Sequence, residues 1–127
     1  FQIALAGEAI RVGQALGYTL EKVRAIEPEK FVRAIEGDKA ALAEIETAMI
    51  PKEGANPRGD IQRPSMAQDI LKGRRTEIEY LNGFVVREGE KVGLACRANA
   101  ALTDIVKRVE KGELKPDPRH VMELRLN

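Results

Sequence analysis

The stretch FQIALAGEAIRVGQALG, residues 1–17, spaces its apolar residues as a helix with two apolar faces. At about 100° per residue, one face carries Phe1, Leu5, Ala9, Val12 and Leu16, and Ile3 and Ile10 lie opposite. Gly17 ends the pattern, because glycine readily adopts the left-handed conformation that closes a helix. The stretch therefore predicts a central helix that is packed from both sides. Glu8 and Arg11 lie three apart on it and can form an ion pair.

The rest of the chain repeats these signals of helix starts and ends. Pro28 suits the first turn of a helix that Gly37 closes, and Asp38 is a good N-cap for a helix over residues 39–50. Further helices are predicted over residues 20–26 (capped by Thr19), 65–72, 76–92, 99–111 and shortly after 118. Sustained alternation typical of strands is missing, and residues 51–63 form one long irregular stretch. We predict an all-α fold of about seven helices.

Composition restricts the class of protein. The chain has 127 residues, the size of one domain, with 43% hydrophobic and 32% charged residues. A net charge of +1 gives no electrostatic reason to expect a nucleic acid or membrane partner. The single Cys96 fits a reducing compartment, and no apolar run approaches a membrane span, so we expect a cytoplasmic protein. Because the chain starts at Phe1 without Met, we interpret it as part of something longer.

Two carboxylates, Glu77 and Glu79, stand at the start of the predicted helix over residues 76–92. The sequence TEIE at residues 76–79 is typical of a capping box, in which the Thr76 hydroxyl accepts from the amide of Glu79 and the Glu79 carboxylate reaches back to the amide of Thr76. This pattern gives Glu79 a structural role.

Glu77 falls inside the apolar arc of the same predicted helix, close to Leu81, Phe84 and Val85 on a helical wheel. A carboxylate in that position needs a cation or hydrogen-bond donors, because burial without them costs several kcal/mol. One interpretation is an ion pair with Arg74 or Arg75, or a favourable place at the positive helix N-terminus. The other is an acid or base of a functional site, whose partner comes from elsewhere.

Ser65 also has two interpretations. SMAQ at residues 65–68 is a second capping box, with Gln68 as the returning side chain. A hydroxyl can accept from an amide while it donates to a ligand, and a helix N-terminus favours a carboxylate-bearing substrate.

Other polar residues give weaker signals. Asn99 is most simply an N-cap, Cys96 a small apolar residue, and Gly83 a place where another helix approaches closely. We find no metal-binding cluster and no glycine-rich strand-to-helix turn that would bind a nucleotide pyrophosphate.

The sequence from residue 63 to 111 resembles the C-terminal domain of the ketopantoate reductase (2-dehydropantoate 2-reductase) family. The resemblance lies in SMAQD at residues 65–69 and in TEIEYLNGF at residues 76–84, followed by Asn99 and ALTDIVKRVE. Over residues 1–50 the likeness is looser, and it is absent from the tail.

This resemblance implies a fold and an activity. Residues 1–127 would form the helical, substrate-side domain, with a fold like the C-terminal domain of 6-phosphogluconate dehydrogenase. An N-terminal Rossmann domain, absent from this chain, would bind most of the NADPH, so no cofactor-binding residue is assigned here. The enzyme would reduce the C2 ketone of ketopantoate, a small 2-oxo acid, to pantoate on the route to pantothenate and coenzyme A. This chain alone would be inactive.

The resemblance also implies roles for two residues. Ser65 would be substrate-binding, and Glu77 would be catalytic, working with a family lysine that acts as general acid to the forming alkoxide. That lysine belongs to a helix upstream of Phe1.

Two alternatives stay open. Three positions before Ser65, where the family has a substrate-binding Asn, this chain has Gln62, so a related reductase of another 2-oxo acid is one of them. The second is a non-catalytic helical interaction module that forms a homodimer through exposed apolar surface.

Overall fold

The structure is a computed structural model that describes residues 1–23, 25–50, 68–70 and 72–124. Its helices are α1 (Gln2–Ala15), α2 (Pro28–Ile35), α3 (Lys39–Met49), α5 (Asn82–Lys91), α6 (Arg97–Glu110) and α7 (Arg119–Met122). Residues 68–70 are also helical. The described residues contain no β-strand, so the predicted all-α fold class is confirmed.

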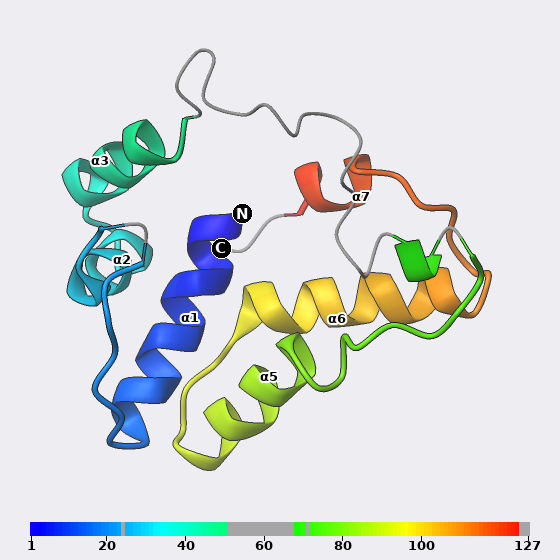
Figure 1. The fold of residues 1–127 in the computed structure, drawn as a ribbon, viewed down its shortest axis with the longest axis horizontal. Helices are drawn as coiled ribbons and strands as arrows, with labels where there is room; N and C mark the ends of the chain where they lie inside the picture. The colour runs from blue at the N-terminus through cyan, green and yellow to red at the C-terminus, as the bar shows by residue number, and fades with distance from the viewer. Residues whose placement is uncertain (24, 51–67, 71, 125–127) are drawn as a thin grey trace.

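Helix α1 lies in the middle of the domain. It runs between the α2–α3 pair and the α5–α6 pair, and it contacts α2, α5 and α6 (Figure 1). Its buried residues are Ile3, Gly7, Ile10 and Val12. The main core cluster joins α1 to α2 and α3 through Ile3, Ile10, Ile26, Phe31, Ala34, Ala41 and Ile45. The prediction of a central helix packed from two sides is therefore confirmed.

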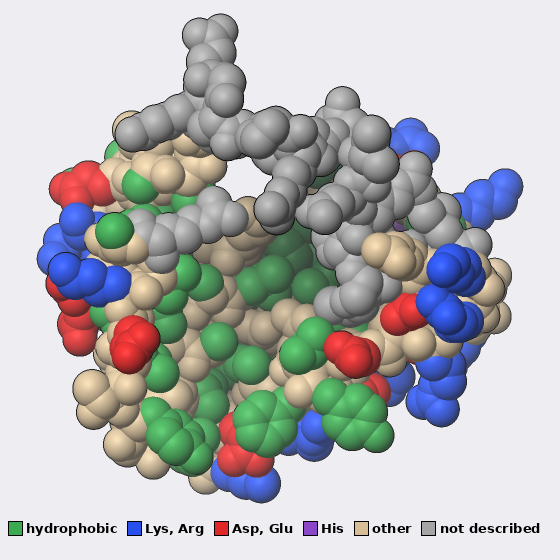
Figure 2. Space-filling model, viewed as in Figure 1, with side chains coloured by type: hydrophobic (Ala, Val, Ile, Leu, Met, Phe, Trp, Pro, Cys, Tyr) green, Lys and Arg blue, Asp and Glu red, His purple; other side chains and the backbone are tan. Residues whose placement is uncertain are grey.

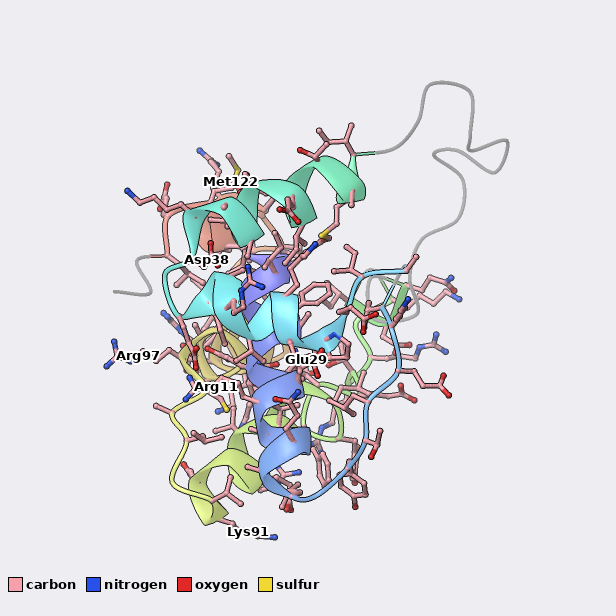
Figure 3. The ribbon with its side chains drawn as sticks, turned by 90° about the vertical axis from the view of Figure 1, so that its left-hand side faces the viewer. Arg11, Glu29, Asp38, Lys91, Arg97 and Met122 are labelled. Carbon is pink, nitrogen blue, oxygen red and sulfur yellow. The ribbon has the colours of Figure 1, made fainter. Side chains whose placement is uncertain are left out.

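Local signals set the helix ends in the first half. Gly17 has a φ of 88° directly after α1, and Pro28 occupies the first turn of α2. Asp38, in the short connection between α2 and α3 (Figure 3), caps α3 by accepting from the amide of Ala41 at 3.0 Å. This hydrogen bond, and a second one from Arg33, lower the pKa of the Asp38 carboxyl. The predicted N-cap is confirmed.

The helix predicted over residues 20–26 does not form in its described residues, 20–23, 25 and 26. Val23 and Ile26 instead form an antiparallel bridge, with N···O distances of 3.0 and 2.9 Å, around Ala25 at a φ of 63°. Glu27 is extended, at a ψ of 137°, because a residue before proline is sterically excluded from the helical region. The turn places Ile26, 9% exposed, in the core. Core packing and Pro28 together override a weak helical pattern.

A glycine in α1 lets α2 approach closely. A Cβ at Gly7 would lie 2.5 Å from Cγ2 of Ile35 and 3.1 Å from the carbonyl oxygen of Phe31. At Gly13 the nearest atom is Cδ1 of Leu20, at 3.3 Å, on a side chain that can move. The carbonyl oxygen of Phe31 belongs to the backbone of α2, so it cannot move aside as the Leu20 side chain can.

We expect Gly7→Ala to lower the free energy of unfolding by about 1–3 kcal/mol, because the added methyl forces α1 and α2 apart. Gly13→Ala, the matched control, should leave it unchanged or raise it by up to about 1 kcal/mol through helix propensity. Urea denaturation of both variants measures the difference. Equal stability of the two variants would contradict the close packing of α1 against α2.

Candidate functional site

Glu77 lies in a turn that precedes α5. The amides of Tyr80 and Leu81 donate to the carbonyl of Glu77 at 2.9 and 3.1 Å, and helix α5 begins only at Asn82. Leu81, with φ of −105° and ψ of −89°, is not helical and separates the turn from α5. The predicted helix over residues 76–92 is therefore wrong in its first six residues.

This change of local structure moves Glu77 out of the predicted apolar arc. Its side chain is exposed, whereas that of the next residue, Ile78, is 1% exposed and part of the interior. Within the described part of the chain, Glu77 forms no side-chain hydrogen bond or ion pair, and Arg74 pairs with Asp69 at 3.1 Å. The ion pair with Arg74 or Arg75, one of the two interpretations of Glu77, does not form within the described residues, and the Glu77 carboxylate is free to meet a partner from outside them.

The capping box predicted at residues 76–79 does not form. The amide and the hydroxyl of Thr76 both donate to Oε1 of Glu110, in the last turn of α6, and the amide contact is 2.7 Å. The Thr76 hydroxyl also accepts from the amide of Ile78 at 3.3 Å. A carboxylate 34 positions away has thus replaced the local partner, Glu79, at the Thr76 amide.

Glu79 binds two cations instead. Its carboxylate contacts Nζ of Lys107 at 2.6 Å and Nη1 of Arg87 at 3.0 Å, and Arg87 also donates to the Glu79 carbonyl at 2.8 Å. The hydrogen bond from Lys107, followed by the charge of Lys107 and the contact with Arg87, lowers the pKa of the Glu79 carboxyl. Through Arg87 in α5 and Lys107 in α6, Glu79 connects the turn to both helices.

Gly83 makes room for this arrangement. A Cβ at this position would lie 2.8 Å from Oε2 of Glu79 and 3.4 Å from the carbonyl oxygen of Ile78. The glycine therefore admits the turn and the Glu79 carboxylate, not another helix as we had expected. Close contacts also occur at Gly89, where a Cβ would lie 2.7 Å from Sγ of Cys96, in the connection to α6, and 3.3 Å from Cγ2 of Val12 in α1.

A buried polar cluster joins the other end of the turn to α1. Asn99, 1% exposed, accepts from Nδ2 of Asn82 at 2.9 Å. Its own amide group donates to the Leu5 carbonyl at 3.2 Å and to Oε2 of Glu8 at 2.7 Å. The cluster therefore connects α1, α5 and α6 through three side chains.

Glu8 also caps α6 from a different helix. Its two carboxylate oxygens accept from the backbone amides of Ala98 at 2.7 Å and Asn99 at 2.9 Å. A negative charge there is favourable because the first amides of a helix are unpaired and carry partial positive charge. The predicted N-cap role of Asn99 is wrong, since α6 already begins at Arg97. The ion pair expected between Glu8 and Arg11 does not form either, and Arg11 lies 4.0 Å from Glu36 instead.

Cys96 is buried beside this cluster, as expected of a small apolar residue. Burial, followed by the nearby charge of Glu8, raises the pKa of its thiol. A thiol of this kind is mostly protonated and unreactive.

Two cavities are relevant to a binding site. One of about 480 Å³ lies beside the Glu77 turn and is lined by Arg75, Thr76, Ile78, Glu79, Tyr80, Arg87, Lys107 and Glu110. A larger one, of about 600 Å³, lies among α1, α2, α3 and the start of α6, on the side where Arg11 and Arg97 are seen (Figure 3). The smaller cavity adjoins the sequence motif and is the better candidate for a binding site, but Glu77 itself is not among its lining residues.

Exposed apolar side chains surround the turn. Tyr80, Leu81 and Phe84 are 81%, 48% and 51% exposed. Figure 2 shows hydrophobic side chains gathered over the end of α1 and over α5. Such a patch is typical of a surface that another domain or molecule covers.

The second predicted site residue, Ser65, lies outside the described residues, as does Gln62. Its proximity to Glu77 stays a prediction. Among the described residues, no group of three or more His, Cys, Asp or Glu side chains is arranged to hold a metal ion. None of the helices in the same residues is long and apolar enough to span a membrane.

Sequence reasoning missed the roles of Lys107 and Glu110, and assigned Glu8 the wrong partner, because the true partners are distant in the chain. One signal was present for Glu8: a carboxylate on a helix with two apolar faces must find donors from another element.

Comparison with known proteins gives the family. Residues 3–110 match the family described as "Ketopantoate reductase PanE/ApbA C terminal". No solved structure gives a significant match.

Curated relatives called 2-dehydropantoate 2-reductase also match. The protein from Archaeoglobus fulgidus is 46% identical over 50 residues, which cover 39% of this chain and 17% of that protein. The protein from Vibrio cholerae serotype O1 is 37% identical over 78 residues, or 61% of this chain and 24% of that protein. The chain thus aligns with less than a third of the length of these relatives. The resemblance found in the sequence is confirmed, and the chain belongs to the ketopantoate reductase PanE/ApbA C-terminal family.

Proposed function

We propose that this chain is the substrate-side domain of an NADPH-dependent oxidoreductase that reduces 2-dehydropantoate (ketopantoate) to pantoate, a step toward pantothenate and coenzyme A. The observation that carries the proposal is the position of Glu77. It stands in the stretch of sequence that carries the resemblance to the family, on a turn tied to α6, with an exposed carboxylate that has no side-chain partner within the described residues.

An exposed carboxylate without a side-chain partner suits the reduction of a ketone. When a hydride reaches a ketone carbon, negative charge develops on the oxygen, and a positioned proton donor lowers the barrier. In the proposal the donor is a lysine from another part of the polypeptide. Glu77 holds that lysine charged and oriented, because a nearby opposite charge favours the ionised form of both groups.

Ser65 has the second proposed role. Its hydroxyl would hydrogen-bond the 2-oxo acid at the start of the helix that the sequence predicts over residues 65–72. A helix N-terminus carries unpaired amides and favours a bound carboxylate.

The cofactor requires a further domain. NADPH supplies the hydride when bound, and a dinucleotide is usually held at the ends of parallel strands in a Rossmann unit. The described residues of this chain are helical and do not fit that role. We therefore propose an N-terminal Rossmann domain in the same cytoplasmic protein, which would cover the patch of Tyr80, Leu81 and Phe84 beside Glu77.

The test is turnover by the full-length protein that contains this chain. NADPH oxidation is followed with ketopantoate and, separately, with 2-oxoisovalerate, which lacks the terminal hydroxymethyl group. We expect a higher kcat/KM for ketopantoate. A preference for 2-oxoisovalerate would assign the scaffold to another 2-oxo acid, a reading that Gln62 favours. Absence of turnover with both acids would contradict a reductase and favour the interaction module.

A further inference from the structure

The turn that carries Glu77 is fastened to α6 at both ends. At its start, the amide and hydroxyl of Thr76 donate to one oxygen of Glu110. At its end, Asn82 donates to Asn99 at 2.9 Å. Helix α6 therefore supplies an anchor on each side of Glu77.

The start of the turn is the more tightly constrained. Thr76 is held through both its backbone and its side chain, and its hydroxyl also accepts from the amide of Ile78. Ile78 is itself buried, at 1% exposure. Glu77 thus lies between two fixed neighbours while its own side chain stays exposed. The backbone of Glu77 sets the direction in which the carboxylate leaves the surface.

Glu110 occupies an unfavourable place for a carboxylate. It is the last residue of α6, where the unpaired carbonyls give the helix end a partial negative charge. The same turn otherwise carries the cations Lys107 and Arg108, which suit that end. The hydrogen bonds from Thr76 compensate for this unfavourable position of Glu110.

We propose that Glu110 is a positioning residue for Glu77, acting through Thr76. This inference rests on the proposed function, because it assumes that the Glu77 carboxylate takes part in the reaction. Glu110 also lines the 480 Å³ cavity beside the turn, but its proposed role is exerted through Thr76 and not by contact with substrate or cofactor. It fixes the backbone from which Glu77 extends. Glu79 holds the middle of the turn through Lys107 and Arg87, and the Asn82–Asn99 pair serves the other end, where Asn99 also supports the packing of α1. Glu110 is the contact to α6 that lies directly before Glu77 and can be removed locally.

The experiment measures kcat and KM of the full-length protein with ketopantoate and NADPH for Glu110→Ala, Glu110→Gln and the control Glu113→Ala. Glu113 is an exposed carboxylate near the same helix end, 3.5 Å from Arg108. We expect Glu110→Ala to lower kcat about 10-fold or more, since small misplacements of catalytic groups have effects of this size. Glu110→Gln should stay within about threefold of the unmodified protein, because its carbonyl oxygen can accept both Thr76 bonds. Glu113→Ala should stay within about twofold.

A double-mutant cycle separates positioning from a general structural effect. If Glu110 acts through Glu77, Glu110→Ala should lower kcat by less than about twofold further in the Glu77→Ala background. The proposal is overturned if Glu110→Ala keeps full activity, if its loss is undiminished in that background, or if Glu110→Gln is as impaired as Glu110→Ala.

Thermal melting shows whether Glu110→Ala is folded at the assay temperature. If it is not, Thr76→Val removes the two bonds of the hydroxyl, to Glu110 and from the amide of Ile78, and keeps the backbone bond to Glu110. It should give a smaller loss of kcat that also disappears in the Glu77→Ala background. A loss of kcat in Thr76→Val that persists there would overturn the proposal.

Hydrogen exchange at the Thr76 amide gives a readout that does not depend on activity. We expect a protected amide that exchanges faster in Glu110→Ala. If the protein reduces no 2-oxo acid while this protection behaves as expected, the proposed function fails and the anchoring geometry stands. If Glu77→Ala retains activity, the positioning role fails with the role of Glu77.

Discussion

Replacing Asn99 by alanine is expected to lower the free energy of unfolding by about 2–4 kcal/mol. The Asn99 side chain is 1% exposed and makes hydrogen bonds to Asn82, Leu5 and Glu8. Truncation leaves Nδ2 of Asn82 without this acceptor and removes the side-chain donor to Glu8 and to the Leu5 carbonyl, although Glu8 keeps its bonds to the α6 amides; a lost partner costs about 1–3 kcal/mol where water cannot replace the bond. Urea denaturation of the chain measures the loss.

The matched control is Gln14→Ala, which removes an exposed amide from α1 and should change stability by less than about 0.5 kcal/mol. A loss for Asn99→Ala no larger than this control would contradict the view that the cluster joins α1, α5 and α6.

Measuring the stability of Asn99→Asp over a series of pH values tests the same cluster independently. The introduced carboxyl would face the Glu8 carboxylate, and two such groups in one site cannot both ionise easily, so the folded-state pKa of one is raised. A group whose pKa is raised in the folded state contributes stability that is lost as the pH rises through that pKa. Relative to the unmodified chain, Asn99→Asp should therefore become less stable from acidic toward neutral pH.

Glu77→Ala is expected to lower kcat of the full-length protein with ketopantoate by about 100-fold or more, the usual size of a general acid–base contribution. Without the carboxylate, the proposed lysine loses the charge that keeps it protonated and oriented. Because Glu77 is exposed and forms no side-chain bond within the described residues, folding stability should be unchanged within about 0.5 kcal/mol. Steady-state NADPH oxidation and thermal melting measure the two quantities.

Two further variants show whether the loss of kcat comes from the charge of Glu77 and whether it is specific to this position. Glu77→Gln keeps the shape and a hydrogen-bond acceptor but removes the charge, so a loss close to that of Glu77→Ala identifies charge as the main contribution. Glu90→Ala removes an exposed carboxylate from α5 and should stay within about twofold. Activity of Glu77→Ala within a few fold of the unmodified protein would refute the assigned role.

The first half of the fold could be predicted from sequence because its signals are local. Gly17 ends α1, Pro28 starts α2, and Asp38 caps α3 through an amide three residues away. Each of these residues acts on the backbone of its own turn. The apolar pattern of α1 likewise placed it in the centre of the domain.

The segment around Glu77 could not be predicted in the same way. TEIE at residues 76–79 is a sound capping pattern, but Glu110 takes the Thr76 amide, and Lys107 and Arg87 take the Glu79 carboxylate. A charged partner from α6 replaces the local bonds, and the helix begins six residues later. Glu8 behaves similarly, because the α6 amides replace Arg11 as its partner. These partners depend on how helices pack, which periodicity does not reveal.

The most direct test of this account is a crystal structure of the full-length protein with NADP⁺ and pantoate bound. We expect the Ser65 hydroxyl to lie within hydrogen-bonding distance of pantoate and the Glu77 carboxylate to line the same cleft, in contact with a lysine beside the C2 hydroxyl. Pantoate bound at a different surface, with Glu77 facing solvent on the far side of the domain, would contradict it.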